Sequence, residues 1–263
     1  MVDPKQIHEQ VAAKFGPVAE KYATSPGHAN QSALSSLVSL VAPSAAAEVL
    51  DIATGAGNVA LAFAPDVARV VAFDLTPSML AQTLKTAAQR GLSNVEAVQG
   101  LAEDLPFEDE SFDVVAVRLA PHHYADIQKA IDEMARVARR GGKVVIVDTT
   151  VPEDDELDRE INEIEKLRDS SHVRNYRPSE WRAMVEKAGL LVEHLAVGRY
   201  TDEFKMEFMD WVERIRTPQA EIDEIRKRFL AASPALKESI LLEVQSDKIE
   251  FVWEQVTLVA LKH

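Results

Sequence analysis

The sequence predicts an α/β fold with a doubly wound, mainly parallel sheet. Three observations predict it. Short apolar runs rich in Val, Ile and Phe recur over the first 150 residues, helical patterns separate them, and a glycine-containing turn directly follows the first run. Runs that are apolar on both faces suit parallel strands covered by helices on either side. A glycine turn at the end of such a strand is where these sheets bind ligands.

Five apolar runs are predicted as strands because they are short and rich in β-branched residues. They lie at 44–52, where a turn of small residues runs into the strand, and at 67–75, 95–100, 112–120 and 143–150. Helices are predicted between them at 58–67, 76–91 and 125–142. The second of these helices begins with Thr76 and a proline and ends in Gly91, which are typical start and stop signals.

The pattern changes after residue 150. Predicted elements there are helices at 152–171 and 177–189, a strand at 190–199, a helical stretch at 203–232 and a last strand at 249–262. Phe204, Phe208 and Trp211 form one stripe along the helical stretch. This stripe packs either in a core or around a bound small molecule.

Composition narrows the class of protein. The chain has 263 residues, 46% of them hydrophobic, with no apolar run of membrane-spanning length and no secretory-type N-terminus, so we expect a cytoplasmic protein. It has no cysteine, which excludes disulfides, thiolate metal sites and cysteine nucleophiles. The net charge of −14 argues against nucleic acid binding, which requires a basic surface.

The stretch VLDIATGAGN at 49–58 carries the predicted ligand loop, and two ligand classes fit it. Gly55, Gly57 and Ala60 match the G-x-G-x-x-A pattern of dinucleotide sites, with Asp74 at the spacing of a ribose-binding acid. The same residues fit S-adenosylmethionine, which has a ribose, a sulfonium and an ammonium group but no phosphate.

Asp51 favours the second ligand. A carboxylate on the strand before the turn attracts a cationic amino-acid group and repels a pyrophosphate. Asp74, at the end of the second strand, is then the acceptor for both ribose hydroxyls. Each acid also has a purely structural interpretation, since it can cap the helix or turn that follows it.

Four segments of the chain are typical of one family: VLDIATGAGN, VAFDLTPSML, VQGLAEDLPFEDESFDVVAVRLAPHHYAD and ARVARRGGKVVIVD. Together they resemble the class I S-adenosylmethionine-dependent methyltransferases, most closely the branch that includes the C-methyltransferases of ubiquinone and menaquinone biosynthesis. The resemblance covers about residues 45–195, and more weakly 15–29. It implies a Rossmann-like, seven-stranded sheet whose last strand is antiparallel, and the run at 249–262 is compatible with that strand.

The resemblance also implies a domain organisation. Residues 1–199 are expected to form the cofactor-binding core with an N-terminal lid segment, and 249–263 the final strand of its sheet. Residues 200–248 match no motif of the family, and we expect them to form a helical insertion that covers the substrate.

Cofactor contacts follow from the same resemblance. The residues at matching positions are Asp51, Ala53, Gly55, Gly57, Asp74, Leu75, Leu101, Ala102, Glu103 and Arg118, with Tyr22 and His28 in a segment that closes over the cofactor. The family often has glycine at the position of Ala53, and many relatives have aspartate at that of Leu101. The adenine amino group is therefore expected to contact the backbone or Glu103.

Catalytic candidates lie in LAPHHYAD at 119–126, directly after the fourth strand. Methyl transfer needs well-positioned partners, and it needs a general base only where the acceptor loses a proton. His122 and His123 are the candidate bases. Both also fit a packing or helix-capping role, which we favour for His122. Their spacing matches no metal-binding motif, so no metal site is predicted.

Four residues are candidate substrate contacts. Asp148 ends the fifth strand, and it orients the substrate, orients a histidine or is a turn residue. His172, Arg174 and Tyr176 lie in SHVRNYRPSEW, a segment that lies beside the acceptor pocket in similar proteins. Arg174 suits an acidic or phenolate-like substrate, although the segment also fits a surface loop that leads into a helix.

We therefore predict an enzyme that transfers a methyl group from S-adenosylmethionine to a small-molecule acceptor and leaves S-adenosylhomocysteine. Carbon, oxygen and nitrogen targets stay open, and aromatic or quinone-like acceptors are included. Two alternatives are a non-catalytic protein that binds this cofactor or its product, and a nicotinamide-dependent oxidoreductase, which Asp51 disfavours. No nucleic acid or membrane partner is expected, and the chain is either a monomer or a homodimer.

Overall fold

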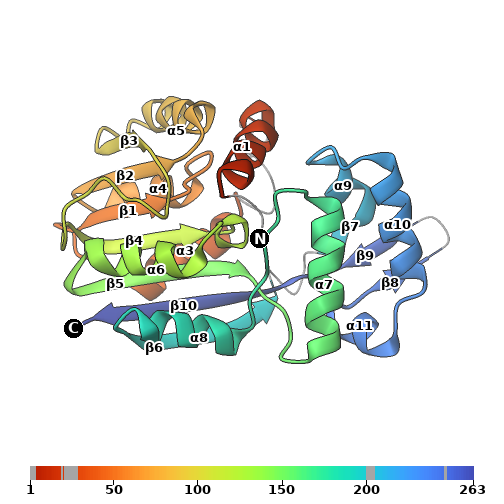
Figure 1. Ribbon diagram of the computed structural model, residues 1–263. Coiled ribbons are helices and arrows are strands. Elements are labelled where there is room, and N and C mark those ends of the chain that lie inside the picture. The colour runs from red at the N-terminus through yellow and green to blue at the C-terminus, as the bar shows by residue number, and fades with distance from the viewer. Residues whose placement is uncertain (1–3, 19, 21–28, 200–204, 246–247) are drawn as a thin grey trace.

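Seven strands form one mixed sheet in the computed structural model, which describes residues 4–18, 20, 29–199, 205–245 and 248–263 (Figure 1). In spatial order they are β3 (Val95–Gln99), β2 (Arg69–Asp74), β1 (Glu48–Ile52), β4 (Phe112–Arg118), β5 (Ala138–Thr149), β10 (Glu254–Lys262) and β6 (Leu190–Arg199). Strands β1 to β5 pair in parallel, and β10 is antiparallel to both of its neighbours. The predicted Rossmann-like sheet with an antiparallel last strand is confirmed.

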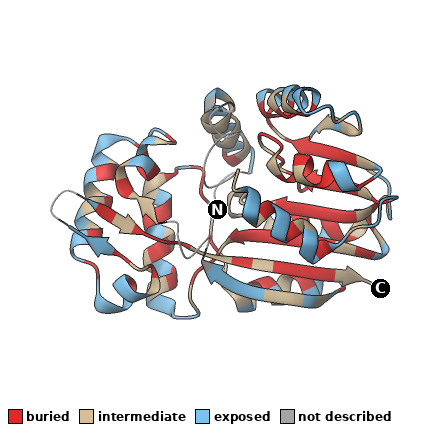
Figure 2. Cartoon of the chain, turned by 180° about the vertical axis from the view of Figure 1, so that it is seen from behind, coloured by how far each residue is buried: buried red, intermediate tan, exposed pale blue. Residues whose placement is uncertain are grey.

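Helices cover both faces of this sheet. They are α3 (Gln31–Val41) and α4 (Asn58–Phe63) on one face, α6 (Ile127–Val137) and α8 (Pro178–Lys187) on the other, and α5 (Pro77–Gln89) beside β2 and β3. Short 3-10 turns are η1 (Gly16–Val18), η2 (Ala64–Asp66) and η3 (Pro121–His123). Successive residues of β1 enter opposite cores, since Val49 packs with α3 and α4 while Leu50 packs with α6 and α8. Burial on both faces, visible in Figure 2, explains why the strands are unbroken apolar runs.

A smaller unit stands beside the carboxyl ends of the parallel strands (Figure 1), and we call it the small module. It contains α7 (Asp155–Arg168), α9 (Phe208–Glu213), α10 (Gln219–Leu230), α11 (Pro234–Ser239) and a sheet in the order β7 (Met206–Glu207), β9 (Ile249–Phe251), β8 (Glu243–Val244). Its own core is rich in aromatic rings, with Trp211 lying 4.9 Å from Phe251 and 6.4 Å from Phe229 between ring centroids.

Two predicted boundaries in the second half of the chain were wrong. The strand predicted over 249–262 is two strands in different sheets, β9 and β10, joined by Val252 and Trp253. The stretch predicted as helical over 203–232 begins with β7 in its described part, and Phe204 lies outside the described residues.

The end of α6 also differs from the prediction. The helix expected over 125–142 ends at Val137, because Ala138 pairs with Phe112 of β4 and the following residues extend β5. The pairing is irregular at this point, so a helix-like sequence became the first part of a strand.

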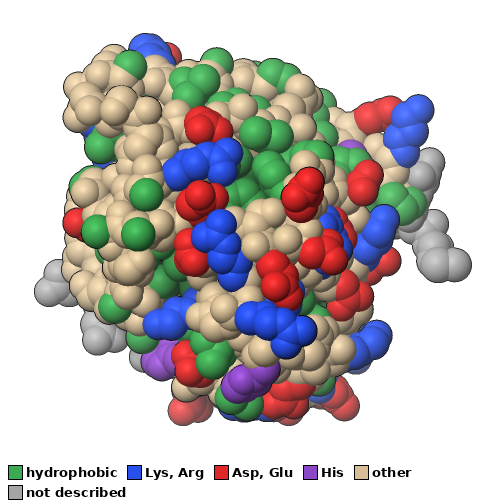
Figure 3. Space-filling model, turned by 90° about the vertical axis from the view of Figure 1, so that its left-hand side faces the viewer, with side chains coloured by type: hydrophobic (Ala, Val, Ile, Leu, Met, Phe, Trp, Pro, Cys, Tyr) green, Lys and Arg blue, Asp and Glu red, His purple; other side chains and the backbone are tan. Residues whose placement is uncertain are grey.

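The amino ends of the parallel strands lie on the side away from the small module. Ion pairs join them: Arg69 lies 2.8 Å from Glu96 and 3.4 Å from Glu48, and Arg139 lies 2.6 Å from Asp113. Figure 3 shows this side of the molecule, where acidic and basic side chains are interspersed around hydrophobic ones.

In the described part of the chain, no helix has both the length and the apolar character needed to cross a membrane.

Candidate active site

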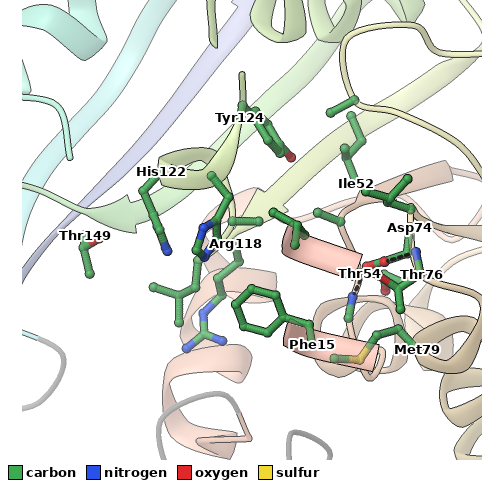
Figure 4. A pocket seen from close by; sticks show the side chains of 18 of the residues that line it. Phe15, Ile52, Thr54, Asp74, Thr76, Met79, Arg118, His122, Tyr124 and Thr149 are labelled. Atoms are coloured by element: carbon green, nitrogen blue, oxygen red, sulfur yellow. Dashed lines mark hydrogen bonds between the residues drawn. The ribbon is translucent and has the colours of Figure 1, made fainter. Parts of the chain in front are cut away.

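A large cavity lies at the carboxyl ends of β1, β2 and β4, between the sheet, α1 (Pro4–Phe15) and the small module. Figure 4 shows its two ends. Asp74, Thr76 and Met79 lie at one end, which we call the loop end because the turns after β1, β2 and β3 form it. His122 and Thr149 lie at the other, which we call the far end.

The turn after β1 uses left-handed backbone at three positions. Ala53, Gly55 and Gly57 have φ angles of 49°, 54° and 85°, a region that favours glycine. A Cβ atom on Gly57 would lie 2.5 Å from Cγ2 of Thr83, whose hydroxyl donates to the Gly55 carbonyl at 2.9 Å. A Cβ atom on Gly55 would meet nothing within 4 Å. Gly57 therefore serves the packing of the turn, whereas Gly55 leaves open space for a ligand.

Asp51 is buried beneath this turn, in the cavity wall. Its Oδ2 accepts hydrogen bonds from the Thr54 hydroxyl at 2.6 Å and the Ala60 backbone N–H at 2.9 Å, so it also caps the first turn of α4. Burial raises the pKa of Asp51 to about 7, because these hydrogen bonds only partly offset desolvation. A cation bound beside Asp51 would restore its charged form.

Asp74 ties two turns together at the end of β2. Its Oδ2 accepts the Gly55 N–H and its Oδ1 accepts the Thr76 N–H, both at 2.8 Å. Burial raises the pKa of Asp74 despite these bonds. Each carboxylate oxygen can accept more than one hydrogen bond, so Asp74 can take ribose hydroxyls while it holds the turns. Leu75 follows it in the cavity wall.

The loop after β3 closes the loop end. Leu101, Ala102 and Glu103 all line the cavity. Oε1 of Glu103 accepts the Ala125 N–H at 3.0 Å and lies 3.5 Å from Nε2 of His8 in α1. The Glu103 carboxylate therefore joins three parts of the cavity wall, and an adenine contact would have to share its oxygens with them.

The structure brings most of the predicted cofactor residues together. Nine of them line the cavity: Asp51, Ala53, Gly55, Asp74, Leu75, Leu101, Ala102, Glu103 and Arg118. Gly57 lies behind the turn, against Thr83. Tyr22 and His28 lie outside the described residues.

Helix α1 lies over the cavity. Its Phe15 lines the cavity (Figure 4), and the Phe15 ring packs edge-on against His123 with 5.1 Å between centroids. Nζ of Lys14 lies 3.1 Å from Oδ1 of Asp169, just after α7. α1 thus contacts the loop end through His8 and the far end through Lys14.

His122 and Asp148 form a buried pair at the far end. Nδ1 of His122 lies 2.6 Å from Oδ1 of Asp148, and the His122 backbone N–H donates to Oδ2 at 2.8 Å. Burial lowers the pKa of His122, but the charge and hydrogen bond of Asp148 outweigh it, so this pKa is raised. A carboxylate that binds Nδ1–H leaves the lone pair of the neutral ring on Nε2.

Asp148 itself was predicted as a substrate contact, and the structure does not support that role. Its side chain is fully buried behind His122 and is not part of the cavity wall. Its oxygens accept bonds from His122 and from the Thr149 backbone. Of the three roles considered for Asp148 from the sequence, orienting the substrate, orienting a histidine or forming a turn, its contacts match the second.

His123 has different surroundings. Its Nδ1 lies 3.1 Å from the carbonyl oxygen and 3.3 Å from Oγ of Ser171. Burial and the neighbouring His122 lower the pKa of His123 to about 3, so its ring stays neutral near pH 7. Of this histidine pair, His122 is the one hydrogen-bonded to a carboxylate, although the sequence favoured a packing role for it.

The other predicted substrate contacts do not reach the cavity. Nη2 of Arg174 lies 2.9 Å from Oδ2 of Asp158 in α7, and Nε2 of His172 lies 3.1 Å from Oδ1 of Asn162. The Tyr176 ring packs at 5.3 Å on that of Trp181. Acidic and amide groups of α7 engage this segment, so its polar side chains hold the segment in place instead of facing the cavity.

Residues that the sequence did not single out form much of the far end. They are Thr149, Glu165, Arg168, Asp169, Met206, Arg214, Val252, Trp253 and Gln255, and Trp211 from the aromatic stripe joins them. They come from four separate segments, so spacing along the chain gave no signal for them. Trp211 satisfies both interpretations of the stripe, since it packs in the core of the small module and also lines the cavity.

Among the described residues, no group of three or more His, Asp or Glu side chains is placed to hold a metal ion.

Comparison with known proteins identifies the family. Residues 50–146 match the family model described as "Methyltransferase domain". The chain is 35% identical over 216 residues to the uncharacterized methyltransferase YcgJ of Bacillus subtilis, which covers 81% of this chain and 84% of that protein. It is 38% identical over 180 residues to the uncharacterized protein YafE of Escherichia coli, which covers 68% and 85%.

Solved structures agree with the sequence comparison. The crystal structure of Bacillus subtilis YcgJ matches with a TM-score of 0.83 and 32% identity, over 88% of this chain and 98% of that one. A structure from Bacillus halodurans matches with a TM-score of 0.83 and 35% identity, over 88% and 99%. The two alternatives to a methyltransferase find no support among these relatives.

The loop end fits S-adenosylmethionine on its own chemistry. Open space at Gly55 allows close approach, Asp51 is a buried acid that a cation would stabilise, and Asp74 has capacity for hydroxyl groups. The chain therefore belongs to the methyltransferase family, and it is an S-adenosylmethionine-dependent methyltransferase.

Proposed function

We propose that the methyl acceptor is a small molecule bound at the far end of the cavity, and that His122 accepts its proton. The observation that carries the proposal is the 2.6 Å contact between His122 and Asp148, because it gives a cavity-lining imidazole a buried carboxylate partner. Phe15, Trp211 and Trp253 add an apolar wall, which suits the body of a small organic molecule.

At the loop end, Asp51 would hold the cationic amino-acid part of the cofactor, and Asp74 its ribose. Leu75 and Ala102 would pack against the adenine, and Arg118 would lie along the methionine part. When bound, S-adenosylmethionine supplies a methyl group activated by its sulfonium. The rest of the chemistry is positioning, which is the larger part of catalysis when the donor is already activated.

His122 would take one proton at Nε2 from an O–H or N–H group of the acceptor. The electron pair that this proton leaves behind would be free to form the new bond to the transferred methyl group, directly or through a conjugated ring carbon, while the electron pair of the bond that the methyl group leaves would stay on the sulfur of the cofactor. Asp148 would stabilise the imidazolium that results, because its charge lies 2.6 Å from Nδ1.

The small module would act as the acceptor cover and α1 as a lid. Several far-end residues, among them Arg168, Met206, Trp211 and Arg214, belong to this module. The proposed cover therefore includes α7 as well as the expected 200–248. Cytoplasmic location, absence of nucleic acid partners and a monomeric or homodimeric state stay predictions from the sequence.

Transfer of a labelled methyl group tests the proposal. The protein is incubated with methyl-labelled S-adenosylmethionine and, separately, with small-molecule, protein and nucleic acid fractions of a cell extract. We expect label in the small-molecule fraction, and a loss of roughly 10²–10⁴-fold in rate for His122→Asn with unchanged cofactor binding. Label only in protein or nucleic acid would overturn the acceptor class, and a full rate for His122→Asn would overturn the base.

A further inference from the structure

Glu165 is a buried carboxyl group that the proposed function does not use. It lies in α7 and lines the far end of the cavity, and 8% of its side-chain surface is exposed. Within the described residues, its only hydrogen-bond or ion-pair partner is Arg168, whose Nη1 lies 3.5 Å from Oε2 of Glu165. The two oxygens of a carboxylate can accept about four hydrogen bonds, so most of this capacity is left for a ligand.

The position of Glu165 on α7 suits an apolar side chain better than a carboxyl group. It follows Ile161 and Ile164 on the buried face of the helix, at the spacing of one helical stripe. The two isoleucines pack in the core of the small module, whereas Glu165 lines the cavity. Burial raises the pKa of Glu165, so the fold disfavours its charged form. A carboxyl group of this kind in a cavity wall is a candidate for ligand binding.

Glu165 and His122 lie near each other but belong to different units of the molecule. His122 lies in η3, beside the large sheet, and Glu165 lies in the small module, and both line the cavity. The charge on each group shifts the pKa of the other, so the two groups are close enough to interact. A molecule bound at the far end can therefore meet His122 with one polar group and Glu165 with another.

The charged groups around Glu165 already have partners. Nζ of Lys14 lies 3.1 Å from Oδ1 of Asp169. Nε of Arg168 donates to the Trp211 carbonyl oxygen at 3.3 Å, and Cζ of Arg168 lies 4.6 Å from the centroid of the Trp211 ring. An ionic group on the acceptor would compete with these contacts. An uncharged hydroxyl group would not, and it both donates and accepts a hydrogen bond, as an un-ionised carboxyl group does.

Resting on the proposed function, we propose that Glu165 binds an uncharged hydroxyl group of the acceptor, distinct from the group that His122 deprotonates. The acceptor is then a molecule with two polar groups, one for the reaction and one for recognition. Specificity follows, because an analogue without the second hydroxyl leaves a buried carboxyl group without its hydrogen bond.

Binding of matched probe pairs tests the inference. Protein saturated with S-adenosylhomocysteine is titrated, with ligand-observed NMR, against resorcinol, 4-hydroxybenzyl alcohol and 4-(2-hydroxyethyl)phenol, in which the two hydroxyls are separated by different distances. Their counterparts carry a methyl ether in place of the second hydroxyl: 3-methoxyphenol, 4-(methoxymethyl)phenol and 4-(2-methoxyethyl)phenol. We expect at least one dihydroxy probe to bind about tenfold more tightly than its ether. Tyramine and 4-hydroxyphenylacetate, which carry a cation and an anion in place of that hydroxyl, should bind more weakly than 4-(2-hydroxyethyl)phenol.

Two substitutions of Glu165 separate its hydrogen bonds from its charge. Glu165→Leu should abolish the preference for the hydroxyl, leave S-adenosylhomocysteine binding unchanged, and keep or raise Tm because it replaces a desolvated carboxyl group with an apolar one. Glu165→Gln should keep most of the preference, since a carboxamide also donates and accepts. Glu165→Ala is the second variant to use if leucine does not fit.

Glu163→Leu is the matched control. Glu163 lies on the same helix, with 51% of its side-chain surface exposed and its Oε2 2.7 Å from Nη1 of Arg228. This variant makes the same chemical change outside the cavity, and it should leave the preference between the probes of each pair unchanged.

Equal binding of every dihydroxy probe and its ether to the wild-type protein would overturn the inference, as would a preference that survives Glu165→Leu and Glu165→Ala. Tighter binding of tyramine or 4-hydroxyphenylacetate would overturn the uncharged hydroxyl. In the labelled-methyl assay, a full rate for Glu165→Leu would overturn the inference and leave the proposed function intact. Conversely, a full rate for His122→Asn would sink the proposed base, while a hydroxyl preference that depends on Glu165 would still stand.

Discussion

Both carboxylate oxygens of Asp148 are bound to one residue, His122. Oδ1 lies 2.6 Å from Nδ1 of the ring and Oδ2 accepts the backbone N–H of the same residue at 2.8 Å. Two bonds from one carboxylate fix both the position of the residue and the orientation of its ring. A side chain held in this way needs little reorganisation to accept a proton, which is the requirement for an efficient general base.

The pair predicts a pH dependence of the rate. A base must be unprotonated, so the rate should rise with pH until it passes the pKa of His122, which Asp148 holds above its ordinary value. Asp148→Asn removes the charge that raises this pKa, and burial then lowers it. The break in the profile of kcat/KM against pH should move to lower pH, with a lower rate at the plateau.

His123→Asn is the control for that measurement. The pKa of His123 is about 3, so this group does not titrate in the range of the assay. The variant should keep the wild-type position of the break even if its rate is lower. If the break moves in His123→Asn and stays in place in Asp148→Asn, the base is His123 and not His122.

Affinity for S-adenosylmethionine should also depend on pH, through Asp51. With a pKa of about 7 in the ligand-free protein, Asp51 is largely protonated at lower pH, and it must lose that proton to pair with a cation. The dissociation constant should therefore rise as pH falls, approaching about tenfold per pH unit below the pKa. Calorimetric titration at several pH values measures this, and the dependence should vanish in Asp51→Asn.

The same carboxyl group should destabilise the ligand-free protein at high pH. The pKa of Asp51 is about 7 in the folded chain, and the ordinary value is 3.8. Between these two pH values the folded state binds more protons than the unfolded state, so the free energy of unfolding falls as the pH rises from one to the other. Asp51→Asn should raise Tm near pH 8 by several degrees and have little effect near pH 4. Thermal unfolding at both pH values checks the sign, and equal shifts at both would contradict it.

Asp74→Asn should weaken cofactor binding more than it weakens the fold. Asparagine has one accepting oxygen, so it can keep the bond from the Gly55 N–H or the bond from the Thr76 N–H but not both, and it offers the ribose a neutral oxygen in place of a carboxylate. We expect a loss of roughly 10-fold to 100-fold in affinity for both S-adenosylmethionine and S-adenosylhomocysteine. Calorimetric titration measures both affinities, and NAD is the control ligand that should not bind. An unchanged affinity in Asp74→Asn would mean that Asp74 only holds the turn.

The two glycines of the first turn should respond differently to alanine. Gly57→Ala forces a Cβ atom to 2.5 Å from Thr83 at a φ of 85°, and it should lower the unfolding free energy by roughly 2–3 kcal/mol. Gly55→Ala meets no atom and should cost only about 1–2 kcal/mol of backbone strain, but it places a methyl group where the cofactor approaches. Denaturant unfolding and cofactor titration separate the two effects. Thr83→Ala should partly rescue Gly57→Ala and not Gly55→Ala.

The loop end was predictable because its chemistry lies at strand ends that the sequence marks plainly. Asp51, Gly55 and Asp74 each follow or end an apolar run, and parallel strands bring their carboxyl ends to one edge. The local sequence pattern and the topology agree here, so three short motifs were enough to predict which residues come together at the loop end.

The far end was not predictable in the same way. Trp253 sits between two strands of different sheets, and β7, β8 and β9 are only two or three residues long, below the length at which alternation is visible. His122 and His123 are neighbours in a 3-10 turn, and only the tertiary position of Asp148 distinguishes them. Arg174 looked available for a substrate because its partner Asp158 lies 16 residues away in another element.

The position of β10 has a consequence for synthesis of the chain. This strand lies between β5 and β6, yet it is made after the whole small module, so β6 has no place in the sheet until the ribosome has delivered residues 254–262. Trp253 and Gln255 enter the cavity wall at the same late moment. A nascent chain can therefore assemble its first five strands early, but it holds an exposed sheet edge and an incomplete cavity until translation is nearly finished.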